Sequence, residues 1–288
     1  MKTKNSLNNL EEVPTFIIRP TKGWRFLNLR ELWVYRELAY FLAWRDVKAR
    51  YKQTALGVAW AVLQPLAMMV IFTLFFGKLA RIPSEGIPYP IFAYAGLLAW
   101  QIFSRAITQS STSLVTEQQL ITRVYFPRII IPFSVVLGAM VDFAISFILF
   151  IALILFYGLV PSANVIWLPL FIGLMLVTGL GIGFWLSALN LEYRDVQHTI
   201  PFLNQLLFFM TPVVYPSSLV PERFQFVYGL NPMNGVIEGF RWALLGVGPG
   251  PSPILVTSIA AALVLFVSGI YFFQWRERTF VDVVGSGG

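Results

Sequence analysis

The sequence contains no cysteine and a single histidine, His198. The absence of cysteine excludes disulfide-stabilised folds, iron–sulfur centres and thiolate zinc sites. One histidine cannot build a multi-histidine metal site, and no G-x-x-x-x-G-K-[S/T] string is present, so the sequence has no phosphate-binding loop of its own. No pair of carboxylates, nucleophile–base set or metal-ligand cluster falls on any one loop. We therefore predict neither catalytic nor metal-binding residues.

Charged residues are also scarce. They make up 12% of the 288 residues, whereas soluble domains contain about 25%, and the mean hydropathy is +0.70. Five stretches carry no Asp, Glu, Lys or Arg, namely 55–77, 86–104, 143–191, 199–221 and 242–275. Because a membrane-spanning helix needs about 20 apolar residues, the sequence predicts an all-α polytopic membrane protein.

We predict six transmembrane helices. The string Pro161-Ser-Ala-Asn164 divides the longest uncharged run, and a Gly/Pro-rich stretch at 246–253 precedes the last span, since such residues favour turns. The predicted spans are 56–77, 88–110, 131–157, 165–189, 199–215 and 254–274. They form a membrane domain at 55–275, which lies between a cytoplasmic N-terminal segment at 1–54 and a cytoplasmic tail at 276–288.

The basic residues are concentrated before the first span. Residues 1–54 contain eleven Lys or Arg and five acidic residues, so most of the net charge of +7 lies there. With the N-terminus in the cytoplasm, the inner segments hold sixteen basic residues and the outer segments four. The positive-inside rule then places both termini in the cytoplasm, and the basic excess indicates contact with lipid headgroups rather than nucleic acid.

Residues 29–53 are predicted to form an amphipathic helix that lies on the membrane surface. Trp33, Tyr40, Trp44, Val47 and Tyr51 recur at helical spacing and share one stripe. Tryptophan, tyrosine and basic side chains together favour the membrane interface. The alternative is a helix that packs on the cytoplasmic loops.

The segment 216–253, between the last two predicted spans, is rich in proline and glycine. Its amphipathic piece, 234–245, is too short to cross a bilayer. Backbone interrupted at membrane depth requires protein or a water-filled cavity around it, so we predict two short re-entrant helices that face a translocation pathway. The alternative is an ordinary extracellular loop. Glu238 and Arg241 lie three residues apart and can pair on one helix face, either as a solvated surface pair or as a contact that stabilises a gate.

Asp142 is the one carboxylate well inside a predicted span. Ionisable groups in the membrane are functional by default, but no other carboxylate, Lys or His lies at comparable depth to relay a proton. A structural bond across a helix interface is therefore favoured over proton coupling. The run Gly179-x-Gly-x-Gly183 follows no strand, so it indicates close helix packing rather than nucleotide binding.

Several strings resemble the polysaccharide-export permeases of the ABC-2 type, which are the membrane subunits that export O-antigen, capsule and teichoic-acid chains. These strings are Arg45-Asp-Val-Lys-Ala-Arg-Tyr-Lys-Gln-Thr-Ala-Leu-Gly-Val-Ala-Trp-Ala-Val-Leu-Gln-Pro65, Tyr125-Phe-Pro-Arg128, Tyr193-Arg-Asp195, Thr211-Pro-Val-Val-Tyr-Pro216 and Asn231-Pro-Met233. The resemblance covers residues 30–275 in order and is closest to the O-antigen branch.

The resemblance implies a homodimer in the bacterial inner membrane that docks two copies of a separate nucleotide-binding subunit. That partner would bind ATP and Mg and move a lipid-linked glycan outward, and this chain itself would bind no cofactor. The docking surface would comprise Glu117, Gln118, Leu120, Arg123, Tyr125, Arg128, Arg194 and Asp195. The periplasmic gate would comprise Tyr215, Pro216, Asn231, Pro232, Glu238 and Arg241.

A basic run precedes the first span, formed by Arg45, Lys48, Arg50 and Lys52. Its positive charge would attract the pyrophosphate of a polyprenyl carrier, or would instead serve topology and headgroup anchoring. Three other functions stay open on the sequence. They are an ABC-2 exporter of a small drug or lipid, a membrane glycosyl- or acyltransferase, and a proton-driven carrier.

Overall fold

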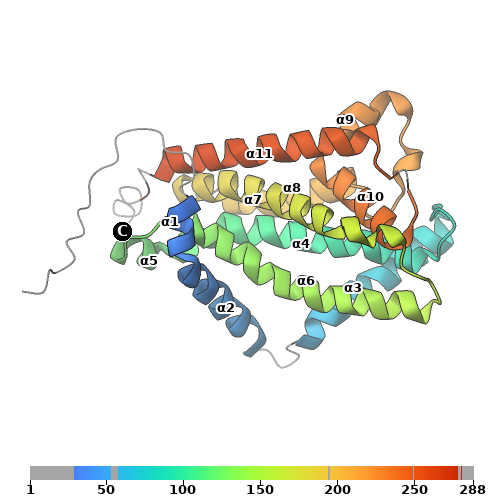
Figure 1. Cartoon of the computed structure of the whole chain (residues 1–288), viewed down its shortest axis with the longest axis horizontal. Coiled ribbons are helices and arrows are strands. Elements are labelled where there is room, and N and C mark those ends of the chain that lie inside the picture. The colour runs from blue at the N-terminus through green and yellow to red at the C-terminus, as the bar shows by residue number, and fades with distance from the viewer. Residues whose placement is uncertain (1–28, 53–57, 194, 249, 278–279, 281–288) are drawn as a thin grey trace, which may run out of the picture.

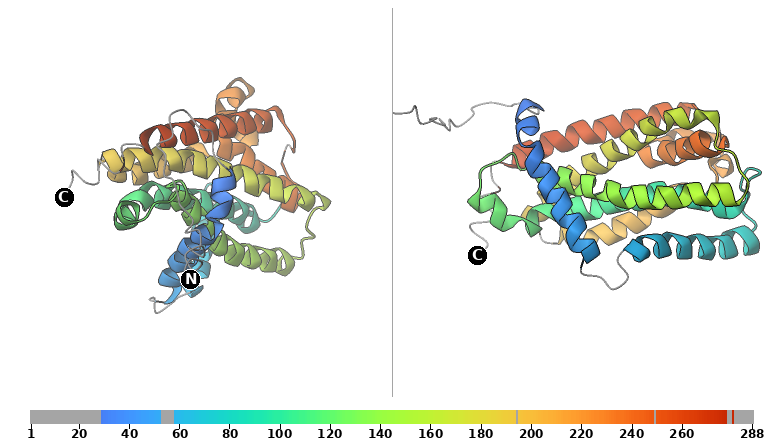
Figure 2. Two further views of the ribbon diagram at one scale, coloured as in Figure 1. Left: turned by 60° about the vertical axis from the view of Figure 1, so that its left-hand side comes forward. Right: turned by 60° about the horizontal axis from the view of Figure 1, so that its bottom comes forward.

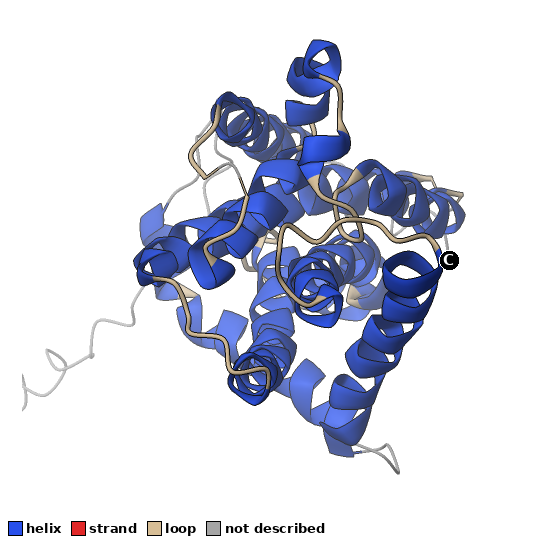
Figure 3. Ribbon diagram, turned by 90° about the vertical axis from the view of Figure 1, so that its right-hand side faces the viewer, coloured by secondary structure: helices blue, strands red, loops and turns tan. Residues whose placement is uncertain are grey.

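The computed structural model describes residues 29–52, 58–193, 195–248, 250–277 and 280. Within these ranges every regular element is a helix and no strand occurs, as Figures 1 and 3 show. The elements are α1 (Leu29–Val34), α2 (Arg36–Lys52), α3 (Val58–Phe72) continued by a π-helix (Thr73–Leu79), α4 (Tyr89–Thr116), α5 (Gln118–Arg123), α6 (Ile130–Phe156), a 3-10 turn (Ala163–Trp167) leading into α7 (Leu168–Glu192), α8 (Val196–Met210), 3-10 turns at Ser217–Leu219 and Glu222–Phe224, α9 (Gln225–Gly229), α10 (Pro232–Leu245) and α11 (Pro253–Glu277).

Five of these helices are long and apolar enough to cross a membrane, namely Ala59–Leu79, Tyr89–Thr116, Ile130–Phe156, Ala163–Glu192 and Pro253–Glu277. They correspond to five of the six predicted spans. The predicted span at 199–215 is not confirmed as a single helix, because α8 has only 15 residues, about 22 Å, and a bilayer core is about 30 Å thick. The helix ends at Met210 because Thr211 precedes a proline, which disfavours helical backbone at the residue before it.

The short α8 nevertheless runs along the bundle. It begins at the end of the molecule where α7 ends and α5 lies, which we term the α5 end (Figure 1). The chain then passes through α9 and α10 at the opposite end, which we term the α10 end, and α11 returns from there toward the α5 end. Figure 3 views the molecule from the α10 end, with the long helices seen nearly end-on and joined by loops across this face.

Helix α4 is the centre of the bundle and contacts α6, α7 and α10. Small residues on α7 allow this close approach. A Cβ on Gly179 would lie 3.1 Å from the Cβ of Ala106, and one on Gly183 would lie 2.8 Å from the Cβ of Ser110. On the other side of α7, a Cβ on Gly181 would lie 2.8 Å from the backbone of Phe266 in α11. The prediction that these glycines serve helix packing is confirmed.

The N-terminal helical region is broken into α1 and α2, and α2 leans obliquely against α6 (Figure 2). Its buried face consists of Ala39, Leu42, Ala43 and Val47, where small residues let it approach α6. Most of the predicted aromatic stripe is exposed, at Trp33, Tyr40 and Trp44. The same stripe was predicted to include Val47 and Tyr51, and this is wrong, since Val47 is buried and Tyr51 points into a polar cluster between the helices.

Candidate functional site

A buried polar cluster joins α2, α4 and α6 partway along the bundle. Asp142 on α6 is 3% exposed. It forms ion pairs with Arg50 of α2 and with Arg105 of α4, the second at 2.6 Å between Nη1 and Oδ2. The Tyr51 hydroxyl also donates to Asp142, and Arg50 donates to the Gln109 side chain at 3.1 Å. We call these five residues the Asp142 cluster.

The Asp142 cluster confirms a bond across a helix interface and corrects one premise of the sequence argument. The sequence places no other carboxylate, Lys or His at the depth of Asp142, but a cation of another kind lies there, since Arg105 is within α4 and reaches the same carboxylate. The available signal was Arg105 itself, an arginine inside a helix that is otherwise free of charge from Tyr89 to Thr116. Burial, followed by the bond to Asp142, raises the pKa of Tyr51 to about 12, so this phenol stays a donor.

A second contact ties α2 to the junction between α4 and α5. Arg45 donates through Nη1 to Glu117 at 3.2 Å and through Nη2 to Asp46 at 3.0 Å. The Glu117 carboxylate raises the pKa of the Arg45 guanidinium above its ordinary value. A polar cavity of about 270 Å³ lies beside these residues. It is lined by Leu42, Arg45, Asp46, Ala49, Arg50, Gln109, Thr112, Ser113, Thr116, Glu117, Ile131, Ser134 and Val135.

The four residues of the predicted basic run are thus not equivalent. Arg45 is held by two carboxylates and Arg50 by Asp142, whereas Lys48 and Lys52 are exposed. Arg45 is exposed as well, and within the described residues it is the one exposed member of the run that forms an ion pair. Among the residues that the structure describes, no three His, Asp or Glu side chains gather closely enough to hold a metal ion.

The predicted docking residues gather at the α5 end. Gln118, Leu120 and Arg123 lie on the short helix α5, and Tyr125 follows it with 72% of its surface exposed. Asp195 is exposed where α8 begins, and Arg194 lies outside the described residues.

Arg128, another predicted docking residue, forms contacts within the chain. Its backbone N–H donates to Glu277 Oε1 at 3.0 Å, and its guanidinium donates to the Glu277 carbonyl and lies over the ring of Phe280. The loop that follows α5 is therefore fastened to the last turn of α11. Arg128 serves this internal contact, whereas Arg123 at the end of α5 and Tyr125 after it are exposed.

The predicted gate residues meet at the α10 end. Asn231 caps α10 by accepting from the Met233 N–H at 3.1 Å, and Pro232 supplies the first helical residue, a combination that starts helices well. The Asn231 amide also donates to Thr211 Oγ1 at 2.8 Å. This bond joins the start of α10 to the end of α8. Tyr215 OH donates back to the Phe209 carbonyl at 3.2 Å.

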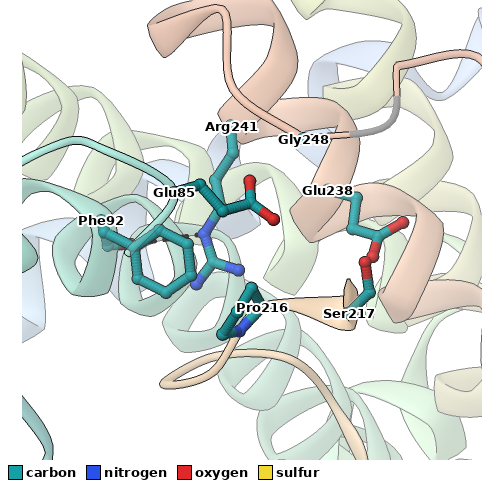
Figure 4. A pocket seen from close by; sticks show the side chains of 7 residues that line it. All are labelled: Glu85, Phe92, Pro216, Ser217, Glu238, Arg241 and Gly248. Atoms are coloured by element: carbon teal, nitrogen blue, oxygen red, sulfur yellow. Dashed lines mark hydrogen bonds between the residues drawn. The ribbon is translucent and has the colours of Figure 1, made fainter. Parts of the chain in front are cut away.

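Glu238 and Arg241 are both buried, at 6% and 3% exposed, so the alternative of a solvated surface pair is wrong. They line a cavity of about 10 Å³, roughly one water molecule, together with Glu85, Phe92, Pro216, Ser217 and Gly248 (Figure 4). Arg241 lies over the ring of Phe92, and the Glu238 carboxylate points toward Ser217. In the described part of the chain no ion pair within 4.0 Å joins Glu238 to Arg241.

Residues 37–245 match the family described as ABC-2 type transporter. Similar curated proteins include the O-antigen export system permease protein RfbA of Myxococcus xanthus, 31% identical over 87% of this chain and 96% of that protein. RfbA of Klebsiella pneumoniae is 32% identical over 83% and 92%. The polysialic acid transport protein KpsM of Escherichia coli is 25% identical over 81% and 91%.

Proposed function

Because the chain belongs to the ABC-2 type transporter family, we propose that it is the membrane permease subunit of an ATP-driven exporter that moves a lipid-linked, O-antigen-like polysaccharide out of the cytoplasm. The observation that carries the proposal is the similarity to O-antigen export permeases over 87% of this chain and nearly the whole of the relative. The bundle of long apolar helices supports a multi-pass location in the inner membrane.

ATP hydrolysis is proposed to occur on a separate subunit that docks at the α5 end. This chain has no phosphate-binding loop, so the energy must be supplied from outside it. The exposed part of α5 and Tyr125 offer a surface for that partner. Because Glu117 also binds Arg45, a push on α5 would reach α2 directly.

The carrier lipid is proposed to approach the bundle beside α2. Lys48 and Lys52 are exposed on α2, and a basic residue near a membrane surface attracts anionic headgroups by about 1 kcal/mol. Arg45 and Arg50 are assigned to holding α2 in place, through Glu117 and Asp142. The polar cavity between α2 and α4 lies next to these residues and would admit a headgroup or sugar unit.

Two copies of the chain are proposed to enclose the pathway, with both termini in the cytoplasm. In this arrangement α8 and the segment 211–217 together make the sixth crossing, and α9 and α10 close the outer end at membrane depth. Apolar side chains exposed on α3, on the π-helix that continues it and on α8 support contacts with lipid or with the second copy. These are Trp60, Leu63, Val70, Ile71, Leu74, Phe75, Phe202, Leu206, Phe209 and Met210.

The first experiment is purification of the chain from its own membranes, followed by an ATPase assay on whatever accompanies it. We expect a stoichiometric P-loop subunit whose hydrolysis is stimulated by lipid-linked glycan. Deletion of the chain should remove surface polysaccharide and leave lipid-linked chains inside the cell. Surface polysaccharide that survives deletion would contradict the cargo, and changed drug resistance would indicate an exporter of small molecules. Conversion of substrate by the chain alone would indicate a transferase.

A matched pair of variants tests the docking surface. Tyr125→Ala removes a side chain that is 72% exposed after α5, and Tyr157→Ala removes one that is 40% exposed after α6, near the α10 end. We expect Tyr125→Ala to weaken co-purification of the ATPase subunit by about tenfold, the size of a contact worth about 1.4 kcal/mol. Tyr157→Ala should have no effect on it. Equal retention of the partner by both variants would place the docking surface elsewhere.

A further inference from the structure

Arg241 holds the loop at the α10 end through backbone carbonyls. Its Nη2 donates to the Val213 carbonyl at 2.7 Å, and its Nη1 donates to the Tyr215 carbonyl at 3.4 Å. Nε reaches the Phe92 carbonyl of α4 at 3.4 Å, and the guanidinium carbon lies 3.5 Å from the centre of the Phe92 ring. One buried cation therefore connects α10, α4 and the segment 211–217, which we call the outer loop.

The position opposite Arg241 accepts no side chain. A Cβ on Gly96 of α4 would lie 2.5 Å from the Val213 carbonyl oxygen and 2.8 Å from Arg241 Nη2. Both distances are shorter than real Cβ contacts, so any other residue would push the outer loop away from the guanidinium. Gly96 is thus a structural requirement of the Arg241 contact.

Glu238 lies almost one helical turn before Arg241 on α10 and faces the same small cavity (Figure 4). The side chain is buried, and its Oε1 atom has no hydrogen-bond partner among the described residues. Burying a carboxylate oxygen without a partner is costly. A group kept at such a cost, three residues from a buried arginine, calls for an explanation beyond packing.

We propose that Arg241 and Glu238 are positioning residues that together form a two-position latch for the outer loop. In the arrangement described, Arg241 binds the Val213 and Tyr215 carbonyls and holds the loop closed. When the loop moves away, the guanidinium passes to the Glu238 carboxylate. The latch rests on the proposed function, because it acts when an outer gate opens during export.

The charge of arginine is what makes a second acceptor necessary. Arginine stays protonated in proteins, so a loop that left Arg241 behind would leave a buried cation with unsatisfied donors. A residue three positions away on a helix is within reach of its side chain. Glu238 therefore removes the penalty of opening while leaving the closed contact intact. Glu85 lines the same cavity from the α3–α4 connection and is half-buried, so it provides the matched comparison.

The absence of native cysteine permits a clean test. Val214, in the outer loop and 6% exposed, is replaced by cysteine, and its labelling by a membrane-impermeant maleimide is measured in the complex purified from its own membranes, with and without ATP. We expect Arg241→Gln to raise labelling at least tenfold without ATP. Glu238→Gln should leave the resting rate within twofold but reduce the ATP-driven rise at least fivefold, and Glu85→Gln should reduce that rise less than twofold.

A second variant guards against loss of folding in Arg241→Gln. Gly96→Ala leaves Arg241 and Glu238 intact and displaces only the contact, so it should also raise resting labelling. If neither Arg241→Gln nor Gly96→Ala raises resting labelling, the latch is contradicted, whatever the chain transports. An ATP-driven rise in Glu238→Gln equal to that of the parent also contradicts it and leaves the proposed function standing. If ATP does not change the labelling rate of the parent chain, both the latch and the proposed function are contradicted.

Discussion

Replacing Asp142 by asparagine removes the negative charge on which the Asp142 cluster depends. The carboxylate binds Arg50 and Arg105 and accepts from Tyr51. Asparagine keeps the volume and one acceptor oxygen, so the change is electrostatic rather than a change of packing. Two guanidinia are then left side by side between α2, α4 and α6 without the carboxylate between them.

The size of the effect follows from burial. Removing one partner of a buried ion pair costs about 3–5 kcal/mol. The side chains of Arg50 and Arg105 keep 29% and 27% of their surface exposed and can turn partly toward water, so we expect the lower end, about 3 kcal/mol. For a chain of this size each kcal/mol lowers the unfolding midpoint by about 2–4 °C, which gives a decrease of about 6–12 °C.

The midpoint can be followed by the fluorescence of the nine tryptophans in lipid nanodiscs. Arg105→Gln alone should lower the stability less than Asp142→Asn does, because Asp142 still forms its ion pair with Arg50. The double variant Asp142→Asn with Arg105→Gln should be more stable than Asp142→Asn alone, since it removes the repulsion between the two cations. A midpoint for Asp142→Asn within about 1 °C of the parent would refute the structural role. Lost export with an unchanged midpoint would instead indicate proton coupling through Asp142.

Two further predictions concern packing and pH. Gly181→Val places a side chain 2.8 Å from the backbone of Phe266 and should destabilise the chain by about 3 kcal/mol. Gly173→Val on the same helix meets nothing within 4 Å and should not, and equal midpoints would refute this account of the α7–α11 contact. Because the folded pKa of Tyr51, about 12, exceeds its unfolded value of 10.0, its stabilisation is complete below pH about 10 and is lost as the pH rises toward 12. Alkaline unfolding curves should show a smaller loss of stability above pH about 10 in Tyr51→Phe than in the parent.

The sequence shows the long helices and their class because length and apolarity are local properties. Runs without charge locate four of the five long helices within a few residues, and the second extends to Thr116 rather than 110. Local rules also explain the start of α10 at Asn231-Pro232 and its end at Gly246, which has a φ of 70°. The small residues of α7 indicate close packing before any partner helix is known.

The charged side chains show where local rules stop. The sequence predicts that Arg45 contacts lipid headgroups, but in the fold it binds Glu117, 72 residues away. Arg50 meets Asp142 across 92 residues, and Arg128 meets Glu277 across 149. Glu238 and Arg241 lie at pairing distance along their helix, yet the carbonyls of the outer loop take the arginine instead.

The sequence by itself therefore determined that this is a helical membrane protein, where its long helices run and which family it resembles. Only the tertiary structure decided which charges are joined inside the bundle, that α8 is too short to span alone, and that Arg241 fastens the outer loop. The physical reason is that a charge buried in apolar surroundings is stable only when it is paired or hydrogen-bonded, and its partner is the group that lies nearest in space. Which group lies nearest depends on how the helices pack, and this cannot be read from the spacing of residues along the chain.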